Sequence, residues 1–107
     1  MQKLELAEYT IYLPLEYNDG TKIEEEKFNK TTEEIVEKFG ALTRQKSGEG
    51  IWTSKEKTYY DSVDKIEIII FDTEENDRWF KEYKGVLKKR FKQKEILIKK
   101  VTGMERL

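Results

Sequence analysis

The sequence predicts a single α+β domain with the element order β-α-β-β-α-β. The chain has 107 residues, which is enough for one domain and too few for two. Apolar residues make up 36% of it and aromatic residues 12%, so it can bury a core. The apolar spacing switches between a period of two and a helical period along the chain, which indicates alternating strands and helices.

The first part of the chain predicts a strand, a turn and a helix. Residues 8–17 alternate apolar and other side chains, which is typical of a strand, and Pro14 is expected near its end because proline cannot donate to a sheet ladder. Asn18–Gly20 predicts the turn. A helix is expected over residues 24–39, followed by Gly40 as its C-terminal stop. Its predicted apolar stripe is Phe28, Thr32, Ile35, Val36 and Phe39.

Two strand regions are expected next, over residues 41–54 and 58–71. The segment Gly48–Gly50 interrupts the first and indicates either a hairpin tip or a bulge. A bulge or bent strand is favoured because strand-forming residues resume at Ile51, and the turn between the strands is then placed at residues 54–57. Residues 66–71 are nearly all apolar. We therefore expect this strand to be central and buried on both faces.

The last two elements are a helix and a strand. Asp72 and Glu75 match a D-x-x-E capping box, and the helix is expected to run to about Phe91. Gly85 lies within it and is interpreted as a close-packing position, because glycine in a helix costs up to about 1 kcal/mol relative to alanine. Residues 95–101 alternate again and predict the final strand.

Right-handed crossovers place both helices on one face of a four-stranded antiparallel sheet, with the first and third strands in its centre. This is the ferredoxin-like arrangement. We expect one domain over residues 1–107, with its core at about residues 8–101 and a flexible tail at residues 102–107.

The chain contains no cysteine and no histidine. This excludes disulfides, thiolate metal sites, cysteine nucleophiles and the commonest general base near neutral pH. We therefore expect no metal site and no cofactor, and the absences favour a protein that is not an enzyme. The N-terminus carries acids where a signal peptide needs an apolar run, and no apolar stretch approaches the roughly 20 residues of a membrane span. A cytoplasmic protein with no membrane partner is expected.

Helices that cover one face of a sheet leave the other face to solvent, a ligand or another subunit. Four aromatic residues are candidates for that face: Tyr12, Trp52, Tyr59 and Tyr60. Large exposed apolar patches usually mark an interface. The first functional hypothesis is a non-enzymatic binding domain that forms a homodimer through this face; the alternative is that these rings pack in the protein's own core.

Glu67 interrupts the apolar third strand and is the candidate for acid or base catalysis. A carboxylate in apolar surroundings can have a raised pKa. On the open face, paired with a lysine or hydrated, Glu67 has an ordinary structural role instead. The second hypothesis is a small enzyme in which Glu67 acts and Tyr12 or Trp52 lines a pocket that accepts a small apolar ligand.

Charge is unevenly distributed along the chain. Residues 84–100 carry eight basic residues against Glu95 alone, whereas residues 1–40 carry five lysines against ten acids. The totals, 21 basic and 22 acidic residues, nearly cancel, which argues against a domain that coats nucleic acid. The third hypothesis is RNA or phosphate binding through Lys88, Lys89, Arg90 and Lys92. The favoured alternative is that these residues complement the helix dipole and pair with the acidic first helix.

Three segments carry a resemblance to a known family: residues 10–15 (TIYLPL), Gly50–Trp52 and residues 83–97. They are similar to the T-x-L-Y-F-G-like opening, the G-x-W and the Y-K-x-R-F-x-Q-E-S-V-L-like close of an uncharacterised bacterial family of short ferredoxin-like proteins, domain of unknown function 3574. This chain has Leu13-Pro14 where the family has Phe-Gly. The resemblance spans roughly residues 9–99 and implies the fold without an activity. By fold analogy alone, the chain also resembles dimeric α/β-barrel proteins, which pack sheet face to sheet face.

Overall fold

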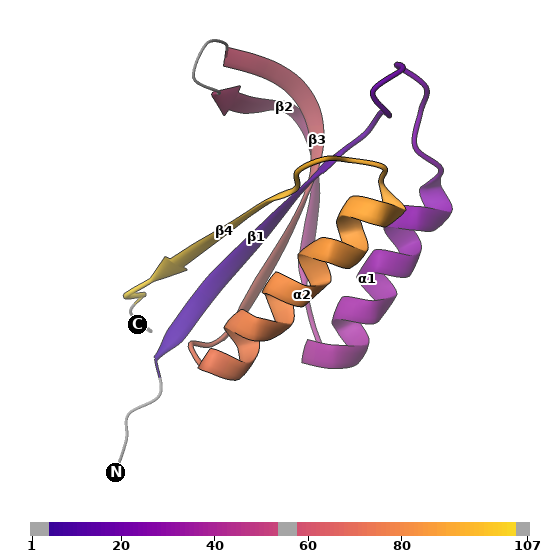
Figure 1. The fold of residues 1–107 in the computed structure, drawn as a ribbon. Coiled ribbons are helices and arrows are strands. Elements are labelled where there is room, and N and C mark those ends of the chain that lie inside the picture. Colours follow the sequence, from indigo (N-terminus) through magenta and orange to yellow (C-terminus); the bar gives the residue numbers. More distant parts are fainter. Residues whose placement is uncertain (1–4, 54–57, 105–107) are drawn as a thin grey trace.

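The protein forms a four-stranded antiparallel sheet with two helices packed on one face (Figure 1). The structure is a computed structural model that describes residues 5–53 and 58–104, and side chains outside residues 47–62. Its elements are β1 (Leu6–Pro14), α1 (Glu25–Phe39), β2 (Thr43–Thr53), β3 (Thr58–Phe71), α2 (Glu74–Arg90) and β4 (Leu97–Thr102). The strand order β2-β3-β1-β4 places β1 and β3 in the centre. The predicted ferredoxin-like fold is confirmed.

β1 lies in the centre of the sheet, and its alternation supplies one face that is apolar throughout. The residues of that face, Ala7, Tyr9, Ile11 and Leu13, are buried beneath the helices. The strand pairs with β3 on one side and β4 on the other, so Ile11 lies opposite both Ile66 and Ile98. Pro14 is the last residue of the strand, where the ladder ends, as predicted.

α1 matches its predicted bounds to within one residue. It ends at Gly40, whose φ of 90° is a left-handed conformation that glycine adopts without strain, and whose N–H donates to the Val36 carbonyl at 2.7 Å. Its buried residues are Phe28, Thr31 and Ile35. The predicted stripe is therefore wrong at Thr32 and Val36, because the contact line with the sheet runs through Thr31 and leaves Val36 44% exposed.

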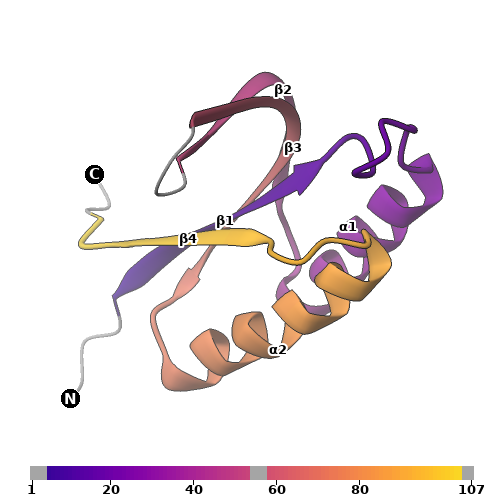
Figure 2. The ribbon, with the colours of Figure 1, turned by 45° about the horizontal axis from the view of Figure 1, so that its top comes forward.

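β2 and β3 form a long hairpin whose register shifts between Ser47 and Gly50, which confirms the predicted bulge. Beyond the bulge the hairpin bends toward the side of the sheet that the helices leave open (Figures 1 and 2). The turn predicted at residues 54–57 lies outside the described residues, as do residues 105–107 of the predicted tail.

β3 is central, as predicted, yet only one of its faces is buried. Ile66 and Ile68 face the helices and are almost fully buried, whereas Ile69 and Phe71 are 59% and 48% exposed. The prediction of burial on both faces is wrong because both helices cover the same side of the sheet (Figure 2).

α2 begins with a side-chain cap from Thr73, whose Oγ accepts a hydrogen bond from the Asn76 backbone N–H at 3.1 Å. The predicted cap at Asp72 is wrong by one position. The interpretation of Gly85 as a close-packing position is also wrong: Gly85 is exposed, and a Cβ added there would meet nothing within 4 Å.

Aromatic rings fill the core between the sheet and the helices. Tyr9 of β1 stacks on Phe80 of α2 with ring centroids 4.2 Å apart, and Phe80 stacks on Phe39 of α1 at 5.4 Å. Trp79 and Tyr83 of α2 stack at 4.4 Å. These contacts join β1 to both helices and hold α2 above the β1 and β4 side of the sheet.

Candidate functional sites

The open face of the sheet has an apolar end formed by the residues nearest the start of β1. Leu6 lies opposite Phe71, and Glu8 lies between Ile69 and Val101 in the next row. Ile69, Phe71 and Val101 are 59%, 48% and 41% exposed. This end of the face is therefore an unusually apolar surface, interrupted by one carboxylate.

Glu67, the candidate acid or base, lies in the middle of the open face. Its cross-strand neighbours are Thr43 on β2 and Thr10 on β1, and Lys99 of β4 follows Thr10 in the same row. Glu67 is partly buried, and Thr10 beside it is 2% exposed. The row is thus polar, with a carboxylate and an ammonium group on the two sides of a buried threonine.

Tyr12 occupies the next row of the open face, between Lys65 of β3 and Leu97 of β4. Two lysine ammonium groups lie near its ring, Lys65 at 5.5 Å and Lys99 at 5.9 Å from the ring centroid. The structure therefore places Tyr12 and Glu67 on the same face of the sheet.

The other three aromatic candidates, Trp52, Tyr59 and Tyr60, lie in the distal part of the hairpin, and their side chains are outside the described residues. The backbone register pairs Trp52 with Tyr59 and Ile51 with Tyr60. Where this hairpin bends, Val63 is fully buried although its pairing with Pro14 places it on the open side.

The basic candidates at the end of α2 have different surroundings. Arg90 bridges to α1: its guanidinium pairs with Glu34 at 2.7 Å and donates to Thr31 Oγ at 2.8 Å, with 11% of the side chain exposed. Lys92, in a left-handed conformation with φ of 52°, lies over the Tyr17 ring at 5.2 Å. Of the remaining two, Lys88 is partly buried and Lys89 is exposed. The structure thus joins Arg90 to the helix pair and leaves a smaller basic surface than the sequence suggests.

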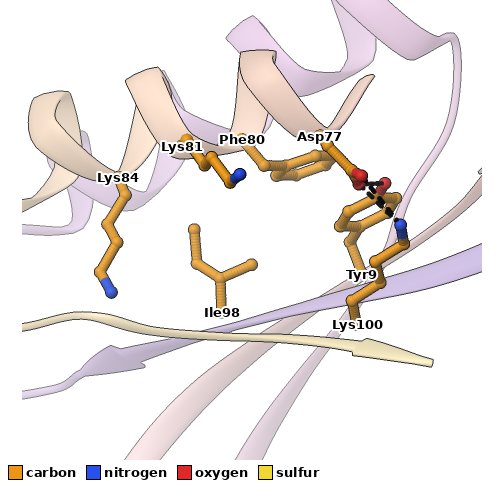
Figure 3. Close-up of a pocket in the computed structure, with 7 residues that line it drawn as sticks. All are labelled: Tyr9, Asp77, Phe80, Lys81, Lys84, Ile98 and Lys100. Carbon is orange, nitrogen blue, oxygen red and sulfur yellow. Dashed lines mark hydrogen bonds and ion pairs between the residues drawn. The ribbon is translucent and has the colours of Figure 1, made fainter. Parts of the chain in front are cut away.

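A pocket opens on the helix side of the molecule, between α2 and the edge strand β4 (Figure 3). Its volume is about 260 Å³. The floor is apolar and consists of Tyr9, Phe80 and Ile98, of which the two rings are almost fully buried.

One end of the pocket is closed by a hydrogen-bonded cluster. Tyr9 donates its hydroxyl hydrogen to Asp77, and the Lys100 ammonium pairs with Asp77 at 2.8 Å and with Asp72 at 2.7 Å. Burial and the Asp77 carboxylate raise the pKa of Tyr9 to about 12, so its hydroxyl stays protonated and donating. The hydrogen bonds from Lys100 and Tyr9 lower the pKa of Asp77. The cluster is a wall whose polar groups bond to one another, with one ammonium group between two carboxylates.

The mouth of the pocket carries Lys81, whose ammonium lies above Ile98, and Lys84, which points from α2 toward the strand beside Ile98 (Figure 3). Lys84 pairs with Glu95 at 2.6 Å, and the Glu95 side chain is 70% exposed. The sequence analysis did not find this pocket. Its signals are Asp77, Lys81 and Lys84, which follow at helical spacing beside the apolar residues of α2, and Lys100, which lies two positions from Ile98 and so on the same, helix-facing side of β4.

The part of the chain that the structure describes has neither a metal-binding cluster nor a membrane-spanning helix. No group of three or more acidic side chains there is arranged to hold a metal ion. Neither of its helices is long and apolar enough to cross a membrane.

No family model and no curated protein sequence matches the chain. Among solved structures, a phage SAM lyase in complex with S-methyl-5'-thioadenosine matches with a TM-score of 0.56 and 19% sequence identity. The match covers 95% of this chain and 86% of that chain. At this level of identity the likeness concerns the fold: the lyase has a similar small α+β architecture over nearly the whole length of this protein.

Proposed function

We propose that the protein is a binding domain that pairs with a second copy of itself through the open face of its sheet. The observation that carries this proposal is the distribution of exposed large apolar side chains. Among the described residues there are six, and four of them belong to the open face: Ile69, Phe71, Leu97 and Val101. Such concentration on one face is typical of an interaction surface.

The charges of this face suit a second copy better than a strongly acidic or basic partner. Glu8 and Glu67 lie on the same face as Lys65 and Lys99, so these two acids are matched by two bases among the described side chains of the face. In a two-fold symmetric contact each patch meets itself in reverse, and the acids of one copy can face the lysines of the other. Both the apolar end and the mixed charges support self-association.

Size-exclusion chromatography with light scattering tests the proposal. We expect the mass of two chains for the unmodified protein and the mass of one chain for Ile69→Lys, because the substitution would bury an unpaired ammonium in the contact. Val36→Lys is the matched control, since Val36 is 44% exposed but lies on α1. A monomeric unmodified protein, or a dimer that Ile69→Lys leaves intact, would contradict the proposal.

A second candidate function is favoured by the structural neighbour. That protein is a SAM lyase bound to S-methyl-5'-thioadenosine, and its fold covers 95% of this chain. The open face of this protein offers an aromatic ring, Tyr12, and a partly buried carboxylate, Glu67. An aromatic ring can stack on a purine, and a carboxylate can act as the base that takes a proton from the amino-acid chain of S-adenosylmethionine while the carbon–sulfur bond breaks and S-methyl-5'-thioadenosine leaves.

Incubation with S-adenosylmethionine separates this enzyme from the binding domain. The enzyme releases S-methyl-5'-thioadenosine, measured by chromatography, and Glu67→Gln lowers that release at least about tenfold, as expected when a catalytic acid or base is removed. Glu37→Gln on α1 is the control that preserves it. If the unmodified protein neither releases S-methyl-5'-thioadenosine nor gives a heat of binding with S-adenosylmethionine, this second function is wrong. The proposal of self-association is unaffected, because the mass measurement tests it separately.

A further inference from the structure

The pocket between α2 and β4 exists because the helix stripe above the edge strand is charged. Asp77, Lys81 and Lys84 follow one another at helical spacing on the side of α2 that faces Ile98 and Lys100. Apolar side chains at these positions would close the gap between helix and sheet, as Phe80 and Leu87 do over the centre of the sheet. The charged stripe instead leaves a hollow of about 260 Å³ over an apolar floor.

We propose that this pocket binds a small amphipathic carboxylate, with its apolar body on the floor and its carboxylate between Lys81 and Lys84. The floor suits an apolar body, because Tyr9 and Phe80 present stacked rings beside the partly buried Ile98. The volume lies below the range of about 300–1,000 Å³ that is usual for sites of drug-sized ligands, so the body must be small.

The charges around the pocket indicate the sign of the ligand. The wall formed by Lys100, Asp72 and Asp77 carries one positive and two negative charges, and the Asp77 oxygens already accept from Lys100 and Tyr9, so the positive charge available to a ligand lies at the mouth. Lys81 makes no ion pair within the described residues. Lys84 is held by the exposed Glu95, and an exposed pair of this kind contributes little and exchanges readily. Two ammonium groups are therefore available to one anionic group at the mouth.

This inference is independent of the proposed self-association, because the pocket and the open face lie on opposite sides of the sheet. Ile98 lines the pocket and Ile69 lies on the open face. Their side-chain methyl groups therefore report separately on the two surfaces, which makes the location of a bound molecule measurable.

The experiment is a titration of the full chain with octanoate at low salt, followed by NMR of isotope-labelled isoleucine methyl groups. We expect a saturable shift of the Ile98 methyl signals with the Ile69 signals unchanged. The double variant Lys81→Gln/Lys84→Gln should bind at least about tenfold more weakly, because it removes both charge-assisted hydrogen bonds to the carboxylate. Lys38→Gln, an exposed lysine on α1, is the matched control and should bind as the unmodified protein does.

Three results would overturn the proposal. A shift confined to Ile69 would place the fatty acid on the apolar open face. Equal affinity of the double glutamine variant would show that the lysines do not hold the carboxylate. The absence of a saturable Ile98 shift would mean that octanoate does not bind in the pocket and that the side chains of Lys81 and Lys84 only cover its apolar floor.

Discussion

Asp64 is fully buried on the helix-facing side of β3, where a carboxylate needs a partner. Arg44 of β2 supplies it: its Nε lies 2.8 Å from one carboxylate oxygen, and a terminal nitrogen lies 2.6 Å from the same oxygen. Arg44 also pairs with Glu25 at the start of α1 and lies over the Phe28 ring. The hydrogen bond to Asp64 raises the pKa of Arg44 further. One guanidinium thus connects β2, β3 and α1.

Arg44→Ala should lower the free energy of unfolding by about 3–5 kcal/mol, because it leaves a buried carboxylate without its counter-charge. Urea unfolding followed by tryptophan fluorescence measures the change. Arg44→Met combined with Asp64→Leu should recover most of the loss, since it removes both charges together. Lys46→Ala is the control: Lys46 is 62% exposed and pairs with Glu25 at 3.6 Å, so its loss should cost less than about 1 kcal/mol. Equal losses for Arg44→Ala and Lys46→Ala would refute the assignment.

At the scale of the elements, local sequence signals predict where helices and strands begin and end, but they do not predict which residues pack against one another. The bounds of α1 and β3 follow from apolar periodicity, from Gly40 and from the turn residues, all of which act over a few positions. The cap of α2 differs by one position, because Asp72 and Thr73 are both good caps and adjacent. The role of Gly85 could not be predicted, since a close contact depends on what the helix packs against.

Gly85→Ala should raise the free energy of unfolding by up to about 1 kcal/mol. The added methyl group meets no atom within 4 Å, and alanine favours the helix over glycine. Gly40→Ala provides the contrast: Gly40 has a φ of 90°, so alanine there should lower the free energy of unfolding by about 1–2 kcal/mol. Thermal unfolding followed by circular dichroism measures both. A destabilised Gly85→Ala protein would mean that this side of α2 meets a partner.

At the scale of the whole molecule, the sheet has one face covered by the helices and one open face with an apolar end. If the open face pairs with a second copy, folding and association are linked and the melting temperature depends on concentration. We expect the melting temperature to rise with protein concentration for the unmodified chain and to stay constant for Ile69→Lys. A concentration-independent melting temperature for the unmodified chain would indicate that the open face of the monomer is stable in water.

Composition and local periodicity were sufficient to establish the order and type of the six elements, the ferredoxin-like fold and the exclusion of cysteine and histidine chemistry. Each of these conclusions depends only on residues that are close together in the sequence or on the number of residues of one type. Only the packed structure decided that Ile69 and Phe71 are exposed, that Arg90 is held by Glu34, and that a pocket lies between α2 and β4. The physical reason is distance along the chain: Tyr9 and Asp77 are 68 positions apart, and Arg44 and Asp64 are 20 apart. Contacts of this kind are set by how the helices pack on the sheet, which no local pattern encodes.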